Sequence, residues 1–427
     1  MLHMHTLLSK LISLQSFIIL GICFLGCKKD SQQTAIVISA ITPAFGPYST
    51  IDTITGSGFN SNAADNNVKF NGMTAVVQKA SATQLIVVVP KAAGTGAVTV
   101  QSGTVSGSGP VFTYIYTGTV ITVAGSGTAG FADGNGAAAQ FSGPYGVTTD
   151  AQGNIYVADY GNVRIRKITS AGIVSTVAGN GTTGYVDGSS SAAEFNSPAA
   201  VSTDAQSNIY VADDLNNRIR KINSSGIVNT FAGSGVGGFA DGIGNAAQFN
   251  DPVGLATDAQ GNIYVSDFLN NSIRKITPDS VVSTFAGSAA LLNGPIGLTT
   301  DAQGNIYVAD ILNNRICKIT SAGVTSTLAG GSVQGYADGI GSAAQFNLPT
   351  GVAADAQGNI YVVDGNNRIR EITPAGVVGT VAGSATPGLT DGVGSAAQFN
   401  GVEAIAIDAH GNIYVADGNR IRMITVQ

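Results

Sequence analysis

The sequence predicts an all-β protein in which a small β-sandwich is followed by a six-bladed β-propeller. Three observations lead to this prediction. A phrase close to "DAQGNIYVAD" recurs six times after residue 118. The Asn residues of successive "NIY" triplets are 54, 54, 43, 54 and 53 positions apart, a period typical of stacked supersecondary units. Residues 35–115 differ from this pattern and consist of short β-branched runs between Gly, Pro, Ser and Asn clusters.

The composition is that of a globular chain with few charges. The 427 residues, of which 44% are hydrophobic and 11% charged, can form two or three domains with substantial cores. The net charge is −6, and the basic residues are scattered along the repeats. Because phosphate binding requires clustered Lys and Arg, we expect no nucleic acid partner.

Residues 1–26 are predicted to be a lipoprotein signal peptide. An apolar run, "FIILGICFLG", follows Lys10 and precedes "CKKDSQQT". The "FLGC" segment resembles the lipobox of bacterial lipoproteins, in which the Cys receives lipid and becomes the new N-terminus. The resemblance implies lipidation of Cys27, a linker over residues 27–34 and an anchor in the bacterial outer membrane, with the chain on the periplasmic or cell-surface side. An uncleaved membrane helix is the alternative.

Residues 35–115 are predicted to form the sandwich. The runs "ITPAFGP", "ITGSGF", "VKFNG", "LIVVVP" and "VFTY" are separated by turn residues, as in small two-layer β domains. This order resembles the IPT/TIG immunoglobulin-like domain, and the resemblance rests on "GSGF" at residues 56–59 and on "VVVP" farther along the chain. It implies a spacer or contact module. We expect a stalk that lifts the next domain off the membrane.

Residues 118–427 are predicted to form the propeller. Each copy carries four strand candidates, such as "GVTTD", "NIYVAD", "RIRKIT" and "VSTVAG", and both faces of the second are mostly apolar. Such a sheet needs a neighbour on each side, which radial packing supplies. The last copy ends at "RIRMITVQ" without a fourth strand, whereas residues 118–127 supply one before the first complete copy. The two fragments predict a closed ring, and the repeated phrase resembles the NHL repeat.

Two sets of repeated Asp residues are predicted to be structural. The Asp that ends "NIYVAD" is followed by Arg in five copies, which indicates an Asp–Arg bridge: Asp159 with Arg164, Asp213 with Arg218, Asp310 with Arg315, Asp364 with Arg368 and Asp417 with Arg420. The Asp-Gly motif of the long connections predicts Asx-type turns. Calcium is the alternative there, although one carboxylate per loop is few for that ion; the residues are Asp133, Asp187, Asp241, Asp338 and Asp391.

The Cys and His residues predict neither a disulfide nor a catalytic centre. The chain contains Cys23, Cys27 and Cys317, so Cys317 is the single thiol left after processing and lipidation. It occupies a position that is Arg in other copies, and we interpret it as a tolerated replacement and not as a nucleophile. His410 replaces the Gln of other copies in a turn. We expect no cofactor and no metal.

Differences between the copies indicate where a ligand binds. The residues that open the innermost strands are Tyr145, Ala199, Val253, Ile296, Thr350 and Glu403. Of these, Tyr145 and Glu403, together with Asp251, are expected to line the mouth of the central channel. The connection from Gly287 to Pro295 is eleven residues shorter than its equivalents. It predicts a notch between the third and fourth blades, with Leu291 and Leu292 exposed at its floor; a simple deletion is the alternative.

The expected function is that of a non-catalytic recognition module that binds a protein or a glycan through the loop face of the propeller. The absence of Trp slightly weakens the case for a glycan. A structural envelope protein is the first alternative. The second is an enzyme, because propellers similar to this family include a zinc-dependent amidating lyase and metal-dependent lactonases. Zinc catalysis needs several converging ligands, and no such set is evident in the sequence.

Overall fold

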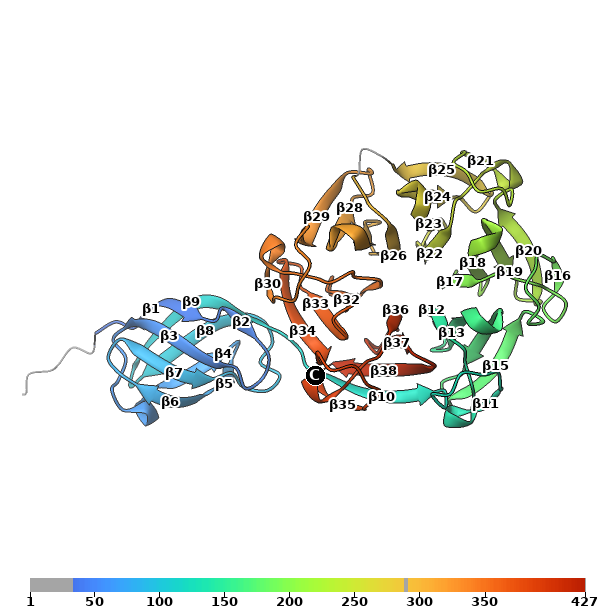
Figure 1. The fold of residues 1–427 in the computed structure, drawn as a ribbon. Coiled ribbons are helices and arrows are strands. Elements are labelled where there is room, and N and C mark those ends of the chain that lie inside the picture. Colours follow the sequence, from blue (N-terminus) through green and yellow to red (C-terminus); the bar gives the residue numbers. More distant parts are fainter. Residues whose placement is uncertain (1–33, 288–290, 427) are drawn as a thin grey trace, which may run out of the picture.

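A computed structural model describes residues 34–287 and 291–426 and confirms the all-β fold (Figure 1). The predicted signal peptide and Cys27 lie outside the described residues. Within the described ranges, the helices are short 3-10 turns, and none is long and apolar enough to cross a membrane.

The N-terminal domain is a β-sandwich of two sheets, as predicted. One sheet contains, in order, β1 (Val37–Thr42), β3 (Ile51–Ser57), β7 (Gln84–Val88) and β6 (Val76–Ala80). The other contains β2 (Phe45–Gly46), β9 (Val105–Tyr114), β8 (Gly96–Ser102), β4 (Asn67–Phe70) and β5 (Met73–Thr74), and the 3-10 turn η1 (Ala63–Asp65) precedes β4. The Phe70 and Phe112 rings meet edge to face at 5.0 Å in the core between the sheets.

The propeller has six blades, numbered here from the first complete repeat, with strands given from the channel outwards. Blade 1 contains β12 (Pro144–Thr149), β13 (Ile155–Asp159), β14 (Arg164–Ile168) and β15 (Ile173–Ala178). Blade 2 contains β17 (Pro198–Thr203), β18 (Ile209–Asp213), β19 (Arg218–Ile222) and β20 (Ile227–Ala232). Blade 3 contains β22 (Pro252–Thr257), β23 (Ile263–Asp267), β24 (Ser272–Ile276) and β25 (Val281–Ala286).

Blades 4 to 6 follow the same order. Blade 4 contains β26 (Pro295–Thr300), β27 (Ile306–Asp310), β28 (Arg315–Ile319) and β29 (Thr325–Gly330). Blade 5 contains β31 (Val352–Ala354), β32 (Ile360–Asp364), β33 (Arg368–Ile372) and β34 (Val377–Gly383). Blade 6 contains β36 (Val402–Ile407), β37 (Ile413–Asp417), β38 (Arg420–Val426) and β10 (Gly118–Ala124).

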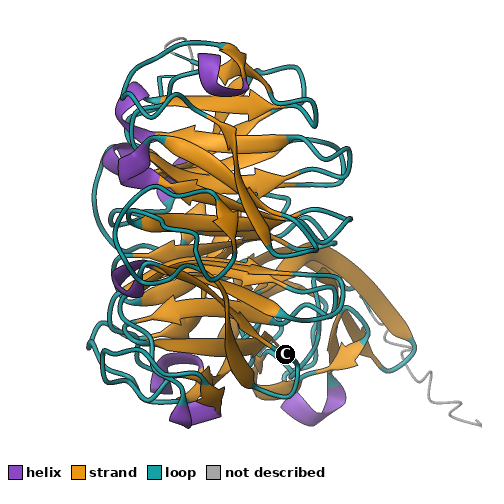
Figure 2. Ribbon diagram, turned by 90° about the vertical axis from the view of Figure 1, so that its right-hand side faces the viewer, coloured by secondary structure: helices purple, strands orange, loops and turns teal. Residues whose placement is uncertain are grey.

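Short elements from the connections complete the blades. In five blades a two-residue strand covers the outer strand: β11 (Gly134–Asn135), β16 (Gly188–Ser189), β21 (Gly242–Ile243), β30 (Gly339–Ile340) and β35 (Gly392–Val393). Four of these strands lead into η2 (Gly136–Ala138), η5 (Gly244–Ala246), η9 (Gly341–Ala343) and η10 (Gly394–Ala396). The second strands of blades 1–4 lead into η3 (Tyr160–Asn162), η4 (Asp214–Asn216), η6 (Phe268–Asn270) and η8 (Ile311–Asn313). Figure 2 shows the ring from the side, with its sheets stacked and most helical turns toward one edge of the view.

The predicted closure of the ring is confirmed. Strand β10 pairs antiparallel with β38 over its whole length, with Gly118 opposite Val426 and Thr122 opposite Arg422. The first strand of the propeller therefore completes the last blade (Figure 1). The closed ring leaves neither end of the array with an unpaired sheet.

The two apolar faces of each second strand pack against the two neighbouring blades. In β13, Ile155 and Val157 share a cluster with blade 6, whereas Tyr156 and Ala158 share one with blade 2. All five positions of this strand are buried in every blade. The inter-blade cores thus follow from the alternation in "IYVAD".

The turn before each second strand is held by its Asp. The Asp150 Oδ1 atom accepts hydrogen bonds from the backbone N–H groups of Gln152 (2.9 Å) and Asn154 (2.8 Å). Gly153 supplies the positive φ of 75° that the turn needs. The same pair of bonds recurs in the other five blades, at Asp204, Asp258, Asp301, Asp355 and Asp408.

The Asp–Arg bridges are present, but in most blades with a different Arg from the one predicted. Asp159 pairs with Arg166 at 2.7 Å, and both side chains are fully buried. Arg164, the predicted partner, stands at the strand end, where its guanidinium donates to the carbonyl oxygens of Asn162 and Asn180. The same correction applies to Asp213 with Arg220, Asp364 with Arg370 and Asp417 with Arg422, while Asp267 pairs with Arg274. The bridge of Asp310 with Arg315 is confirmed.

The Asp-Gly carboxylates do not form the predicted Asx-type turns, because they bind these same Arg residues. Asp133 accepts a 2.7 Å bond from Arg166 Nη2 and bonds from the backbone N–H and hydroxyl of Thr176. Arg166 therefore links two carboxylates, one from its own hairpin and one from the covering segment. Four further blades repeat this arrangement, with Asp187, Asp241, Asp338 and Asp391.

The sandwich joins the propeller at blade 5 through a short linker. The backbone N–H of Tyr116 donates to Glu371 Oε2 at 3.4 Å, and the Ile115 side chain packs over Gly379. A Cβ atom at Gly379 would lie 2.6 Å from Ile115 Cγ2, so this contact requires Gly. Four other blades have Lys at the position of Glu371 and a polar side chain at that of Gly379. These two substitutions mark the blade on which the linker packs.

Glu371 should make the stability of the chain depend on pH. Burial raises the pKa of this carboxyl to about 7, so the folded chain keeps a proton that the unfolded chain loses from about pH 4.5 upwards. The contribution of Glu371 to the free energy of unfolding is therefore fully present at acidic pH and falls as the pH rises to about 7. A Glu371→Gln variant should have nearly the same free energy of unfolding as the native chain at pH 5. At pH 8 its free energy of unfolding should be higher than that of the native chain by up to about 3 kcal/mol. The measurement is the free energy of unfolding as a function of pH, with Glu194→Gln as control. Parallel profiles for the native chain and Glu371→Gln would contradict the prediction.

Candidate functional site

The innermost strands of the six blades surround one cavity in the central channel. All six equivalent residues at or just before the start of these strands line it: Tyr145, Ala199, Val253, Ile296, Thr350 and Glu403. The cavity holds about 430 Å³ of empty space, part of it open to solvent. The repeats therefore direct one variable position per blade to a common space.

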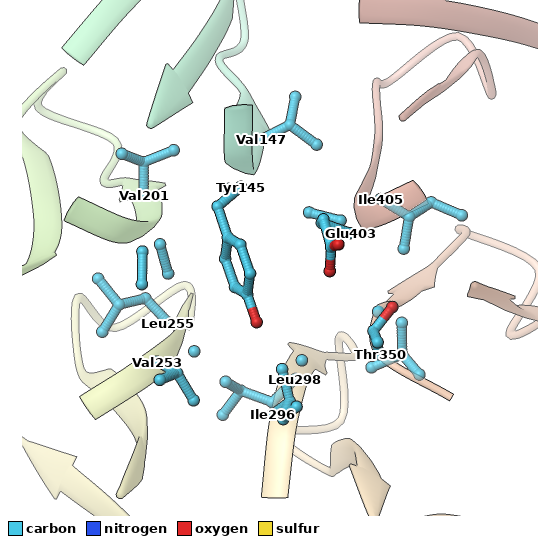
Figure 3. A pocket seen from close by; sticks show the side chains of 18 residues that line it. Tyr145, Val147, Val201, Val253, Leu255, Ile296, Leu298, Thr350, Glu403 and Ile405 are labelled. Carbon is cyan, nitrogen blue, oxygen red and sulfur yellow. The ribbon is translucent and has the colours of Figure 1, made fainter. Parts of the chain in front are cut away.

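Tyr145 and Glu403 are the two large polar side chains in this cavity. They come from β12 and β36, which lie next to each other where the ring closes. Figure 3 shows the Tyr145 phenol extending across the channel, with the Glu403 carboxyl beside it. Burial, followed by the charge of Glu403, raises the pKa of Tyr145 to about 12, so its hydroxyl remains a donor at neutral pH. Burial also raises the pKa of Glu403.

Three further residues lie near Tyr145, and none of them, including the predicted Asp251, is among the residues that line the cavity. The Tyr160 ring, from η3, lies 5.7 Å from the Tyr145 ring between centroids. Asp251 and Asp214 are close enough that their charges raise the pKa of Tyr145. Asp251 has a φ of 64°, a conformation that Asp tolerates better than most residues, and its backbone N–H is bound by the Asn217 side chain of blade 2 at 3.1 Å.

Asp214 and Asp251 form a pair of carboxyl groups between blades 2 and 3. Asp214 is only 7% exposed, and its Oδ1 atom has no hydrogen-bond partner among the described residues. Burial and then the hydrogen bond and charge of Asp251 raise the pKa of Asp214 well above its usual range. Asp214 therefore keeps its proton at neutral pH, and the pair carries less charge than two free carboxylates.

The opposite side of the cavity is apolar. Val253, Leu255, Ile296 and Leu298 line it from blades 3 and 4, and Thr350 adds a hydroxyl from blade 5 (Figure 3). No Lys or Arg is among the residues that line the cavity. The cavity thus combines the Tyr145 ring and the Glu403 carboxyl on one side with aliphatic side chains on the other. Such a surface can bind a small polar ligand that has an apolar face.

The predicted notch has one exposed Leu and one buried Leu. Leu291 is 74% exposed, whereas Leu292 is 7% exposed and packs in the core between blades 3 and 4. The prediction that Leu292 is exposed was therefore wrong. Leu292 stands three residues before Pro295, the position that Phe141 occupies before Pro144, and like that Phe it fills the gap between two blades.

Cys317 is fully buried, in the position of the bridging Arg of other blades. Its Sγ lies 3.7 Å from Asp310 Oδ2, and burial raises its pKa to about 12. The thiol therefore stays protonated at neutral pH, which is unlike a nucleophilic Cys. Arg315 takes over the pairing with Asp310 through its Nε atom at 2.7 Å.

Within residues 34–287 and 291–426, no group of three or more His, Cys, Asp or Glu is placed to hold a metal ion. His410 lies in the exposed turn where the sequence placed it, and its backbone N–H donates to Asp408 Oδ1 at 2.8 Å.

Sequence reasoning missed Tyr160 and Asp214. Both follow the Asp that ends the second strand, a position occupied by Tyr160, Asp214, Phe268, Ile311, Gly365 and Gly418 in the six copies. The position varies between copies as strongly as that of Tyr145. Its variation was a signal, but only the structure shows that Tyr160 and Asp214 lie near Tyr145.

A sandwich joined to a closed six-bladed ring defines a class of modular β-propeller proteins. The family model of the IPT/TIG domain matches residues 37–116, and that of the NHL repeat matches residues 141–168, 249–276 and 346–370. The chain therefore carries an IPT/TIG domain followed by NHL repeats, as the motifs predicted.

Three similar proteins place these domains in context. Protein SUPPRESSOR OF QUENCHING 1, chloroplastic, from Arabidopsis thaliana is 29% identical over 311 residues; the match covers 70% of this chain and only 26% of that protein. An auxiliary nutrient binding protein from Bacteroides thetaiotaomicron has a similar structure, with a TM-score of 0.57, 18% identity, and coverage of 92% of this chain and 98% of its own. A gluconolactonase from Xanthomonas campestris has a TM-score of 0.51, 15% identity, and coverage of 73% and 90%. At these identities, the likeness to the two solved structures shows only that this chain has the same fold.

Proposed function

We propose that this protein is a non-catalytic recognition module of the bacterial cell envelope that binds its ligand at the mouth of the propeller channel. The observation that carries the proposal is the convergence of variable residues there. The repeats are nearly identical in their turns and bridges, yet the positions around Tyr145 differ from blade to blade. A purely structural ring does not need this difference.

The chemistry of the mouth favours a saccharide over a charged macromolecule. The Tyr145 ring provides a flat apolar surface with a polar end, and the Glu403 carboxyl provides an acceptor for hydroxyl groups. No basic side chain lines the cavity. A protein that shares the fold along almost its whole length is described as a nutrient binding protein. A partner protein that inserts one side chain into the mouth is the second possibility.

The anchor is part of the same proposal. Lipid on Cys27 would hold the chain at the outer membrane, with the sandwich as a spacer below the propeller. Labelling of cells with a radioactive fatty acid tests it. Label on the native chain and none on Cys27→Ser supports the anchor, whereas an unlabelled native chain overturns it.

A screen of melting temperatures tests the proposal at the mouth. Residues 28–427 would be melted with a panel of bacterial and host polysaccharides and their monosaccharides. A ligand at one hundred times its Kd stabilises the folded chain by about 2.7 kcal/mol, a shift that is readily measured. We expect at least one saccharide to raise the melting temperature of the native chain and to lose this effect in Tyr145→Ala. Turnover of any panel member would contradict the non-catalytic role.

A further inference from the structure

The outer edge of blade 4 differs from the edges of the other five blades. Its sheet contains four strands, from β26 to β29, whereas each of the others has a fifth, two-residue strand along its outer edge. That strand comes from the connection preceding the blade, and the connection before blade 4 is the shortened one. Among the described residues, β29 pairs with β28 alone. Within residues 34–287 and 291–426, blade 4 therefore has an open edge, along which Thr325, Thr327, Arg315 and Leu291 lie.

The covered blades show what such an edge binds. In blade 1 the covering strand pairs antiparallel with β15, with Gly134 opposite Val174 and Asn135 opposite Ile173. The carboxylate of Asp133 then accepts bonds from the backbone N–H of Thr176 and from Arg166. An extended backbone and one carboxylate are thus supplied together by the same segment.

In blade 4 the corresponding groups are present without this segment. Thr325 and Thr327 stand at the positions of Val174 and Thr176. The Thr325 hydroxyl is buried and has no hydrogen-bond partner among the described residues. The strand contains neither Lys nor Pro, the residues that commonly protect an edge from pairing. Leu291 is exposed beside it, and its carbonyl oxygen accepts a bond from Arg315 Nη2 at 2.9 Å.

The charged residues at this edge of blade 4 differ from those of the other blades, as does the connection that precedes the blade. Blade 4 lacks the Asp of the covering segment, and it also lacks the Arg that would bind that Asp, because Cys317 stands there. Arg315 instead reaches Asp310 at 2.7 Å and donates to the Thr327 hydroxyl at 3.0 Å. Its side chain remains 21% exposed. The Arg315 guanidinium therefore lies at Thr327. The equivalent residue of blade 1, Thr176, binds the Asp133 carboxylate.

We propose that the open edge of blade 4 is a docking site for an extended segment of a partner protein. The segment adds to β29 as an antiparallel strand and places an Asp or Glu on Arg315 and Thr327. Strand addition of this kind provides affinity through the main chain and specificity through alternate side chains. The Asp-Gly segments of the chain itself are held by Arg in their own blades, so a second copy is not the expected occupant. This site is independent of the channel mouth.

Hydrogen exchange of the full chain with a peptide probe tests this proposal. The probe is a peptide with the sequence of residues 335–344, "GYADGIGSAA", which covers blade 5. We expect it to slow exchange of the Thr325 and Thr327 amides while leaving the equivalent amides of β15 and β20 unchanged. Asn in place of the peptide's Asp should weaken binding about tenfold, the value of one hydrogen bond to a charged group.

Two controls separate strand addition from other contacts. A peptide methylated on its backbone nitrogens cannot pair with β29 and should protect no amide. A chain in which residues 233–250 replace residues 287–293, with Cys317→Arg, supplies its own covering strand and should not bind the probe. The proposal is overturned if the probe protects neither Thr amide, if the methylated peptide binds equally well, or if the native chain dimerises and the graft abolishes the dimer.

Discussion

An Arg220→Leu variant is expected to lose about 3–5 kcal/mol of unfolding free energy, because one substitution leaves several buried groups without a partner. Arg220 is fully buried and binds Asp213 at 2.7 Å and Asp187 at 2.6 Å. It also donates to the carbonyl oxygens of Glu194 and Val186, both at 2.9 Å. Leu fills part of the volume but satisfies none of these acceptors. Urea unfolding followed by tyrosine fluorescence and circular dichroism measures the loss.

Neighbouring substitutions show whether the bridge is responsible. Lys221→Leu changes the next residue of the same strand, whose ammonium lies over the Tyr210 ring, and should cost no more than about 1 kcal/mol. Asp213→Asn in the Arg220→Leu background should recover part of the loss, because it removes the buried charge. Equal losses from Arg220→Leu and Lys221→Leu would show that the bridge is not a main source of stability.

Removal of β10 is expected to abolish the cooperative unfolding of the propeller. A chain that begins at Thr117 keeps this strand, and a chain that begins at Gly125 lacks it. The loss exposes β38 and removes the fully buried Val120 and Ala124, which pack in two different inter-blade cores. Six paired positions and one buried Val amount to roughly 5 kcal/mol or more, comparable to the stability of a whole domain.

Calorimetry of the two truncated chains measures this effect. The chain from Thr117 should melt in one sharp transition, and the chain from Gly125 should show a broad transition or aggregate. A synthetic peptide of residues 117–127 added to the shorter chain should restore part of the transition, as expected if the strand acts through pairing. Identical melting of the two chains would contradict the closure of the ring by β10.

Much of the fold could be predicted because the residue pattern of each repeat indicates its strands and the faces on which they pack. The alternation in "IYVAD" requires a neighbour on both faces, and the fragments at the two ends of the array require each other. The bridging Arg was assigned wrongly in four blades because spacing alone favours the nearer Arg. Across a hairpin, an Asp at the strand end can also reach the Arg two positions farther along, and only that side chain is enclosed.

The site was predictable where it depends on alignment and not where it depends on the shape of a turn. Tyr145 and Glu403 could be placed in one cavity because they open equivalent strands of neighbouring blades. The positions of Tyr160 and Asp214 near Tyr145 could not be predicted, because the direction of a short turn is not visible in the sequence. Leu292 was misplaced because the shortened connection hides its equivalence to Phe141. Cys317 can be explained only together with the missing Asp-Gly segment. In blade 4 the Asp of that segment is absent, and so is the Arg that binds it in the other blades.

Titration calorimetry of the chain of residues 28–427 tests the central claim, recognition at the channel mouth, most directly. The titrant is the saccharide that gives the largest melting shift, and the proteins are the native chain, Tyr145→Ala and Tyr48→Ala, whose Tyr lies exposed on the sandwich. We predict binding at one site, weakened about tenfold or more by Tyr145→Ala and unchanged by Tyr48→Ala. Equal affinity of the native chain and Tyr145→Ala, or no binding of any saccharide, would contradict the claim.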